Sequence, residues 1–133
     1  MKMKNVVVAI FCITALQVYG GQKIEIVNIA ENPIKVRPWW DGSSNALQEI
    51  PARQKGAPGK HLSYEAAGLH RLKKVMWNDL GVCYKAEVGH LTDGVNRFKS
   101  VRILIYSGGE FEFVIGDYRS FEMLKASVES GAC

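Results

Sequence analysis

The sequence predicts a mainly β protein: a small antiparallel β-sandwich, or a partly open barrel, with a short C-terminal helix. Apolar and polar residues alternate along most of the chain, which is the period of a half-buried strand. Turn-rich segments containing Gly, Pro, Asn and Asp separate the alternating runs. Few windows show the helical period, and one of them lies near the C-terminus.

Residues 1–20 have the character of a cleavable secretory signal peptide. Lys2 and Lys4 precede a mostly apolar, uncharged run from Val6 to Val18. That run is shorter than the roughly 20 residues that a membrane-spanning helix needs. We therefore expect export to a secreted or extracytoplasmic location, with a single mature domain over residues 21–133. The alternative is a retained N-terminal anchor.

Export changes how the charge and the cysteines are interpreted. The leader holds two of the 17 basic residues and none of the 13 acidic ones, so the mature chain keeps 15 against 13 and a net charge near +2. A charge this small gives weak support for an anionic partner. Cys12 leaves with the leader, and the remaining Cys83 and Cys133 predict a disulfide in an oxidising compartment. The alternative is a free terminal thiol that pairs with another chain.

The first part of the mature domain predicts two strands. Residues 23–29 place Ile24 and Ile26 on one face, and residues 34–40 place Ile34, Val36, Pro38 and Trp40 on one face. Because Pro38 has no N–H to donate, the second half of this strand is expected at a sheet edge. Residues 41–45 then predict a turn, 46–50 a short strand, and 51–60 an exposed loop.

The run KIEIVNIAENPIKVRPWWDGSS, residues 23–44, resembles the opening of thaumatin-like β-sandwich proteins. In those proteins a strand ending in Val-Asn leads through a turn to a second strand and a tryptophan. The resemblance implies a β-sandwich. The dense disulfide framework of that family is absent here and the chain is much shorter, so no function is carried over.

The middle of the domain combines alternation with one irregularity. Leu62, Tyr64 and Ala66 alternate, but apolar residues between Leu69 and Trp77 fall on both parities. We expect a bulge near residues 73–74, because one inserted residue returns both halves to a common face. Residues 78–81, NDLG, then predict a hairpin turn into residues 82–88, where Cys83 faces away from the buried side.

Residues 101–116 predict a hairpin whose register can be argued from parity. A three-residue loop, Gly108 to Glu110, pairs Ile105 with Phe113 and Ile103 with Ile115. This register keeps the apolar residues on one face, so burial favours it.

The last segment, SFEMLKASVESGAC, predicts a short amphipathic helix. Phe121, Leu124 and Val128 recur at spacings of three and four, and Ser120 is a suitable N-cap. A helix laid on the sheet and held by a Cys83–Cys133 bond accounts for these features.

Motifs of catalysis are missing. The chain has no HExxH, GxSxG, P-loop, dinucleotide fingerprint or CxxC. His61, His70 and His90 lack the short spacing typical of zinc sites. We therefore expect no catalytic residues, no metal, no cofactor and no enzymatic activity. The alternative is a hydrolase that gathers one of these histidines with a carboxylate.

The first candidate contact site is the patch of Lys35, Arg37, Trp39 and Asp41. In a regular strand Trp39 lies opposite the buried face, near enough to Arg37 for a cation–π contact of about 0.5–1 kcal/mol. An exposed tryptophan followed by polar residues suits a glycan, a protein or a lipid surface. The alternative is that Trp39 is covered by packing. Trp77 and Tyr84 are expected as cross-strand core residues.

A second candidate is the basic loop of Arg53, Lys55 and Lys60, followed in the sequence by Arg71, Lys73 and Lys74. Such a loop suits a polyanion or a lipid headgroup. The repeated basic–aromatic pattern of nucleic-acid binders is absent. Together these features predict a non-enzymatic binding module, with a membrane-active or toxin-like protein as the alternative.

Overall fold

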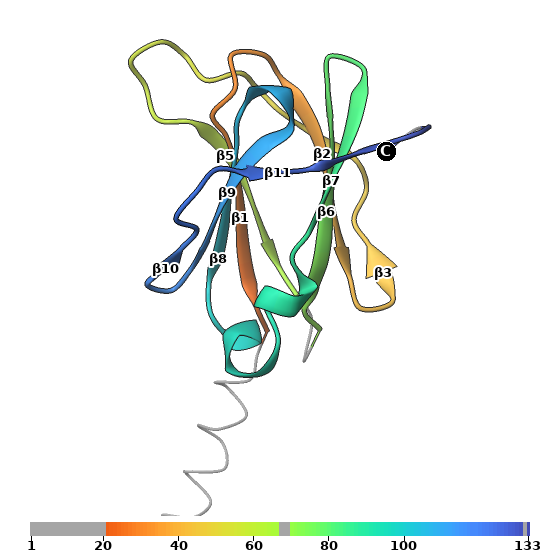
Figure 1. Cartoon of the computed structure of the whole chain (residues 1–133), viewed down its shortest axis with the longest axis vertical. Coiled ribbons are helices and arrows are strands. Elements are labelled where there is room, and N and C mark those ends of the chain that lie inside the picture. Colours follow the sequence, from red (N-terminus) through yellow and green to blue (C-terminus); the bar gives the residue numbers. More distant parts are fainter. Residues whose placement is uncertain (1–20, 67–69, 132) are drawn as a thin grey trace, which may run out of the picture.

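The computed structural model describes residues 21–66, 70–131 and 133, which form two β-sheets packed together (Figure 1). This confirms the predicted β-sandwich; the predicted signal peptide, residues 1–20, lies outside the described residues. Sheet A has the strand order β10-β9-β8-β1-β5, with β11 also paired to β9, and sheet B has the order β12-β7-β6-β2-β3, with β4 also paired to β2. In the described part of the chain every pairing is antiparallel except that of β1 with β8.

The strands of sheet A are β1 Lys23–Asn28, β5 Lys60–Glu65, β8 Val101–Ile105, β9 Glu110–Ile115, β10 Tyr118–Arg119 and β11 Leu124–Lys125. Those of sheet B are β2 Ile34–Trp40, β3 Ser43–Ser44, β4 Gln48–Ile50, β6 Leu72–Asp79, β7 Val82–Glu87 and β12 Ser127–Glu129. Short 3-10 turns occur at η1 Gly89–Leu91, η2 Gly94–Phe98 and η3 Ser107–Gly109.

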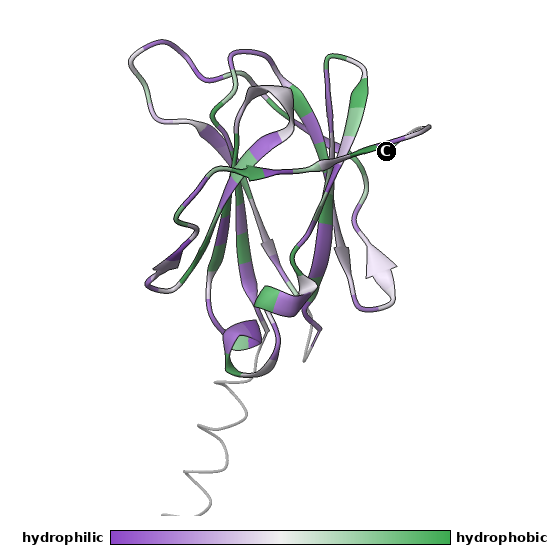
Figure 2. Ribbon diagram, viewed as in Figure 1, coloured by the Kyte–Doolittle hydropathy of each residue, from purple (hydrophilic) through white to green (hydrophobic). Residues whose placement is uncertain are grey.

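The core lies between the sheets and follows from the alternation in sequence (Figure 2). Ile24 and Ile26 of β1 face it from sheet A, and Val36 and Trp77 face it from sheet B. The Trp77 ring packs on Tyr84, its directly opposite residue on β7, with centroids 5.8 Å apart. This confirms the predicted cross-strand contact.

Buried Asn28 fixes the crossing from sheet A to sheet B. Its Nδ2 donates to the carbonyls of Asn32, Ile50 and Pro51, and its Oδ1 accepts from the N–H of Ala30. One side chain thus satisfies the backbone of the turn between β1 and β2, which sets where β2 begins.

Strand β6 contains the predicted bulge. Trp39 pairs with Lys74 and Trp40 with Leu72, so Lys73 is the extra residue. The hairpin turn after β6 is also confirmed, since Asp79 pairs with Val82. However, the alternating residues 62–66 do not continue into this strand: β5 belongs to sheet A, and the chain changes sheets before β6.

The β8–β9 hairpin has a three-residue loop, but the predicted register was wrong by two residues. Ile105 pairs with Phe111 and Ile103 with Phe113, so the loop is residues 107–109. Gly108 and Gly109 have φ of 74° and 82°, the left-handed region that glycine adopts at low cost. A Cβ on Gly109 would lie 2.4 Å from Cε1 of Tyr84, so this close approach also requires glycine.

The predicted C-terminal helix was wrong. The segment is extended: β11 pairs with β9, and β12 pairs with β7 at the other sheet (Figure 1). Phe121 is 98% exposed and Val128 67%, so the residues at helical spacing share no buried face. The segment crosses from the edge of one sheet to the edge of the other because both edges offer unpaired backbone groups. Between them, the Ala126 N–H donates to the Gly109 carbonyl, 2.8 Å away.

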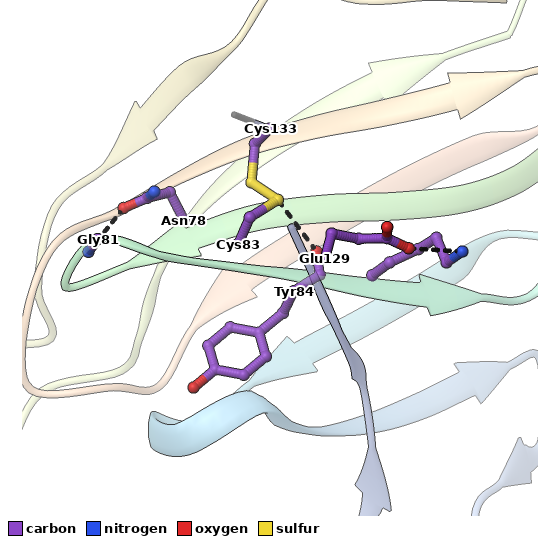
Figure 3. The surroundings of a disulfide bond; sticks show 7 residues. Asn78, Gly81, Cys83, Tyr84, Glu129 and Cys133 are labelled. Atoms are coloured by element: carbon purple, nitrogen blue, oxygen red, sulfur yellow. Dashed lines mark hydrogen bonds and ion pairs between the residues drawn. A yellow bond between two sulfur atoms is a disulfide. The ribbon is translucent and has the colours of Figure 1, made fainter. Parts of the chain in front are cut away.

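The predicted disulfide joins Cys83 on β7 to Cys133, with an S–S distance of 2.02 Å (Figure 3). It closes a span of 50 residues and holds β12 against β7.

Candidate functional site

The predicted patch lies on the outer face of sheet B. Lys35, Arg37 and Trp39 alternate with the buried residues of β2, and Asp41 follows the strand. Lys35 is exposed, whereas Arg37, Trp39 and Asp41 are half-buried. The structure therefore brings these four residues to one face.

The predicted sheet edge at the second half of β2 was wrong, because β3 pairs with Trp39 and Trp40 on the side of the strand away from β6. Pro38 itself has no partner in β3 or β4. Its carbonyl accepts from the N–H of Asn45 in the segment between β3 and β4, at 3.2 Å. In an antiparallel strand the nitrogen of a residue points the same way as its carbonyl, so the proline ring nitrogen faces the gap between β3 and β4 and not β6, and its missing N–H removes no hydrogen bond to β6.

The two adjacent tryptophans have different environments. Trp40 is 8% exposed, packs in the core, and donates its indole N–H to the Asn45 side chain. Trp39 points outward, and the ammonium of Lys74 lies over its ring, 5.0 Å from the centroid. The cation on the indole is thus Lys74 and not the expected Arg37. Lys74 is directly opposite Trp39 across the β2–β6 pair, and opposite residues are closer than residues two apart along one strand.

Two N–H groups on this face lack acceptors. Trp39 Nε1 and Arg37 Nε are buried and hydrogen-bond to no residue that the structure describes. A buried donor without an acceptor costs about 1–3 kcal/mol. This face of β2 therefore has hydrogen-bonding capacity that the described chain does not use.

An open groove of about 570 Å³ adjoins Trp39. It is lined by Trp39, Trp40, Asp41, Gly42, Lys73, Lys74, Glu87, Gly89 and His90. Trp39 and Asp41 of the predicted patch line it, whereas Lys35 and Arg37 lie farther along the strand. Sequence reasoning missed the part played by Glu87 and His90. The predicted turn at 78–81 was enough to place Glu87 opposite Lys74, but nothing in the sequence showed that β6 pairs with β2.

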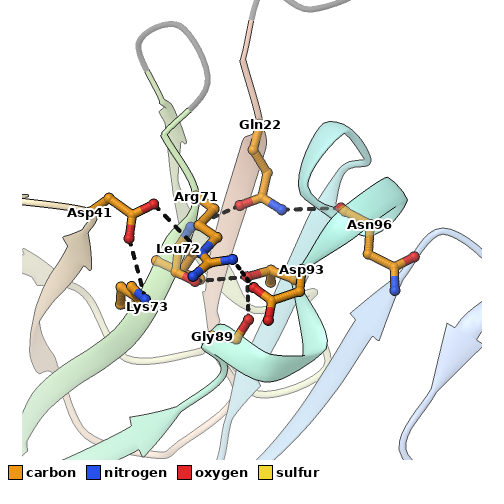
Figure 4. A network of polar contacts seen from close by, with 9 residues as sticks. Gln22, Asp41, Arg71, Leu72, Lys73, Gly89, Asp93 and Asn96 are labelled. Atoms are coloured by element: carbon orange, nitrogen blue, oxygen red, sulfur yellow. Dashed lines mark hydrogen bonds and ion pairs between the residues drawn. The ribbon is translucent and has the colours of Figure 1, made fainter.

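A polar network supports the base of the groove (Figure 4). Arg71 binds Asp93 and lies 3.5 Å from Asp41, which is also 3.4 Å from Lys73. Next to this network, buried Gln22 accepts a hydrogen bond from the N–H of Leu72 and donates one to the Asn96 carbonyl. The start of β6, and with it one wall of the groove, is fixed by these contacts.

The acidic groups farther across sheet B are also paired. Lys85 lies 3.5 Å from Glu87 and 2.6 Å from Glu129. The hydrogen bond and charge of Glu129 raise the pKa of Lys85, and those of Lys85 lower the pKa of Glu129. Arg37 and Lys74, by contrast, form no ion pair with any described residue.

The basic loop lies apart from this groove. Arg53, Lys55 and Lys60 are exposed, and their loop leads into β5 of sheet A (Figure 1). A Cβ on Gly59 would lie 2.8 Å from Val27 Cγ1, so the loop packs closely on β1. The structure therefore separates the two candidate sites, although Lys73 and Lys74 join the groove.

The histidines do not assemble into a metal site. His61 is on β5, and His70 and His90 lie outside the strands. Within residues 21–66, 70–131 and 133, no group of three or more His, Cys, Asp or Glu side chains is placed to hold a metal ion.

A second hollow, of about 520 Å³, lies over the outer face of sheet A. Its lining includes Lys23, Glu65 and Arg102, and Arg102 is paired with Glu25 at 3.2 Å. None of the buried donors without acceptors belongs to a described residue of this hollow. We therefore favour the Trp39 groove as the candidate site.

Comparison with known proteins adds no family, because no protein-family model and no curated protein matches this sequence.

Proposed function

We propose that this protein is an exported, non-enzymatic binding module that holds a saccharide on the outer face of sheet B, around Trp39. One observation supports this most directly: Trp39, which lines an open groove, keeps an N–H donor that has no acceptor among the described residues, and Arg37 keeps another farther along the same strand. Buried polar groups are nearly always hydrogen-bonded in folded proteins, so each exception needs an explanation. Trp77 in the core and Arg97 in η2 also keep such donors, and we propose a ligand as the explanation only at Trp39 and Arg37, because an open groove adjoins Trp39.

Export is supported by the sequence of the leader and by the Cys83–Cys133 bond, which is compatible with an oxidising compartment. No helix among the described residues is both long enough and apolar enough to span a bilayer.

A saccharide is favoured over a lipid surface by the composition of the groove. Inserting into a membrane interface requires exposed apolar neighbours beside the tryptophan. None of the large apolar side chains that stand exposed among the described residues, such as Phe121 or Leu80, lines the groove. An indole flanked by hydroxyl, ammonium and carboxylate groups suits a sugar ring, which has an apolar face and a polar rim.

A non-enzymatic role is favoured over hydrolysis by the state of the groove's acid and base. His90 and Glu87 line the same groove, but no hydrogen bond between described residues orients the His90 imidazole, and Glu87 is paired with Lys85. A general base needs a partner that orients it and a matching acid.

A screen against a glycan array and against vesicles with and without anionic lipid tests the proposal. We expect saccharide binding that falls about tenfold or more in Trp39→Ala, since aromatic anchors dominate such surfaces. Tyr118→Ala is the matched control, because it removes an exposed aromatic side chain on sheet A. Binding to vesicles alone, or saccharide binding that survives Trp39→Ala, would refute the proposal.

A further inference from the structure

We infer that the saccharide is acidic: a sugar ring stacks on Trp39, while its carboxylate or sulfate group pairs with Lys74 and Arg37. This inference rests on the proposed function and adds the charge of the ligand, which the groove alone does not define.

The first support is a row of side chains across sheet B. Ser44, Trp39, Lys74 and Glu87 occupy directly opposite positions on the four adjacent strands β3, β2, β6 and β7. Neighbouring strands lie about 4.8 Å apart, so the row spans roughly 14 Å. A hydroxyl, an indole, an ammonium and a carboxylate therefore follow one another along a line that fits a short oligosaccharide.

The second support is the state of the charges near this row. Each acidic group of the groove already has a cation: Asp41 has Arg71 and Lys73, and Glu87 has Lys85. Arg37 and Lys74 make no such close ion pair with any described residue, although the charge of Lys74 also helps to lower the pKa of Glu129. A neutral sugar would leave Arg37 and Lys74 without a close ion pair. An acidic group on the sugar would pair with both cations and would also accept hydrogen bonds from the N–H groups of Arg37 and Trp39.

The third support is that Lys74 can leave the indole at little cost. Its ammonium lies on the Trp39 ring, 5.0 Å from the centroid, where a sugar ring would stack. A half-exposed cation–π contact is weak, so displacing it reduces binding by about fivefold at most. The flexible stem of lysine lets the ammonium move to the edge of the ring and meet the acidic group there.

Calorimetric titration of the purified protein, expressed from the full-length sequence, separates charge from stacking. The probes are trigalacturonate and its methyl ester, then chondroitin sulfate tetrasaccharide and its desulfated form. We expect at least one acidic probe to bind about tenfold more tightly than its less charged counterpart, with an advantage that shrinks as salt is added. Lys74→Gln should reduce that advantage by about two- to fivefold. Lys55→Gln, a charge change on the distant basic loop, should leave it intact.

The outcomes distinguish the two proposals. If a probe and its less charged counterpart bind with equal affinity and both require Trp39, the protein does not select its ligand by negative charge. This inference then fails, while the proposed function stands. If the advantage of the acidic probe is lost in Lys55→Gln and kept in Lys74→Gln, the acidic group binds the basic loop and the inference also fails. If no saccharide binds in this titration or on the glycan array, both proposals fail together.

Discussion

On the outer face of sheet A several charged side chains pair with one another, whereas on the outer face of sheet B two donors on β2 have no acceptor within the part of the chain that the structure describes. In sheet A, Arg102 pairs with Glu25, and Glu112 accepts from both Tyr106 and Arg119. In sheet B, the Lys74 ammonium lies over the Trp39 ring, and the buried N–H groups of Trp39 and Arg37 find no acceptor in residues 21–66, 70–131 and 133. The first face thus has contacts between its own charged side chains, while the second keeps two donors that, in our proposal, a ligand would satisfy.

The neighbouring tryptophans give the largest expected contrast. Trp40 fills the core, so Trp40→Ala should reduce the free energy of unfolding by about 3–5 kcal/mol. Trp39 lies on the outer face, so Trp39→Ala should reduce the free energy of unfolding by about 1 kcal/mol or less while weakening ligand binding about tenfold or more. Urea denaturation measures both. Equal losses of stability would mean that Trp39 serves packing, and the contrast between the faces would lose its basis.

The disulfide should separate stability from binding within sheet B. Cys133→Ser removes the bond that holds β12 to β7, and should reduce the free energy of unfolding by about 2–4 kcal/mol. Because Cys83 and Trp39 are not paired positions and lie on different strands, ligand affinity should stay within about twofold. A large loss of affinity would show that the β12 edge is part of the binding face.

The contact between the two sheets at Tyr84 can be tested with two adjacent glycines. Gly108 and Gly109 both have positive φ, but only the Cβ of an alanine at 109 would meet the Tyr84 ring. Gly109→Ala should therefore lose about 1–3 kcal/mol more stability than Gly108→Ala, the matched control for backbone strain. Equal losses in chemical denaturation would place the loop away from Tyr84.

The contacts of Glu112 with Tyr106 and Arg119 on the outer face of sheet A predict a small dependence of the free energy of unfolding on pH. The hydrogen bond from Tyr106, and then Arg119, lower the pKa of Glu112. Stability from this carboxylate is fully present above its ordinary pKa, near 4.5, and is lost as the pH falls through the lower value of the folded state. Glu112→Gln should flatten the decline of unfolding free energy below that pH, and the exposed Glu110→Gln should not. An unchanged acid limb would mean that the Tyr106–Glu112 pair contributes nothing to stability.

The sequence predicted the features that depend on local chemistry. The bounds of β2, the bulge at Lys73, the turn after Asp79 and the Cys83–Cys133 bond follow from alternation, turn residues and cysteine number. The register of the β8–β9 hairpin did not follow, because a shift of two residues keeps every side chain on the same face. The close approach of Gly109 to Tyr84, which comes from the other sheet, was not visible in the sequence.

Features that depend on distant partners were beyond sequence reasoning. The C-terminal segment has helical spacing, but the open edges of β9 and β7 take its backbone hydrogen bonds, and tertiary pairing overrides such local preference. The same holds for the site. Trp39 was identified from its place in the strand, but its neighbours Lys74, Glu87 and His90 depend on the pairing of β2, β6 and β7.

The most direct test of the account is a nuclear magnetic resonance titration of the three indole N–H signals, assigned with Trp39→Phe. The Trp40 N–H is bonded to Asn45 and Trp77 lies in the core, so only Trp39 offers an indole N–H at the proposed binding face. On addition of the tightest-binding saccharide, we predict a shift of the Trp39 indole signal, accompanied by backbone shifts along β2, β6 and β7. An unchanged chemical shift of the Trp39 indole N–H, with backbone shifts confined to β1, β5 and β8 of sheet A, would contradict the account and would place the binding site on the opposite face.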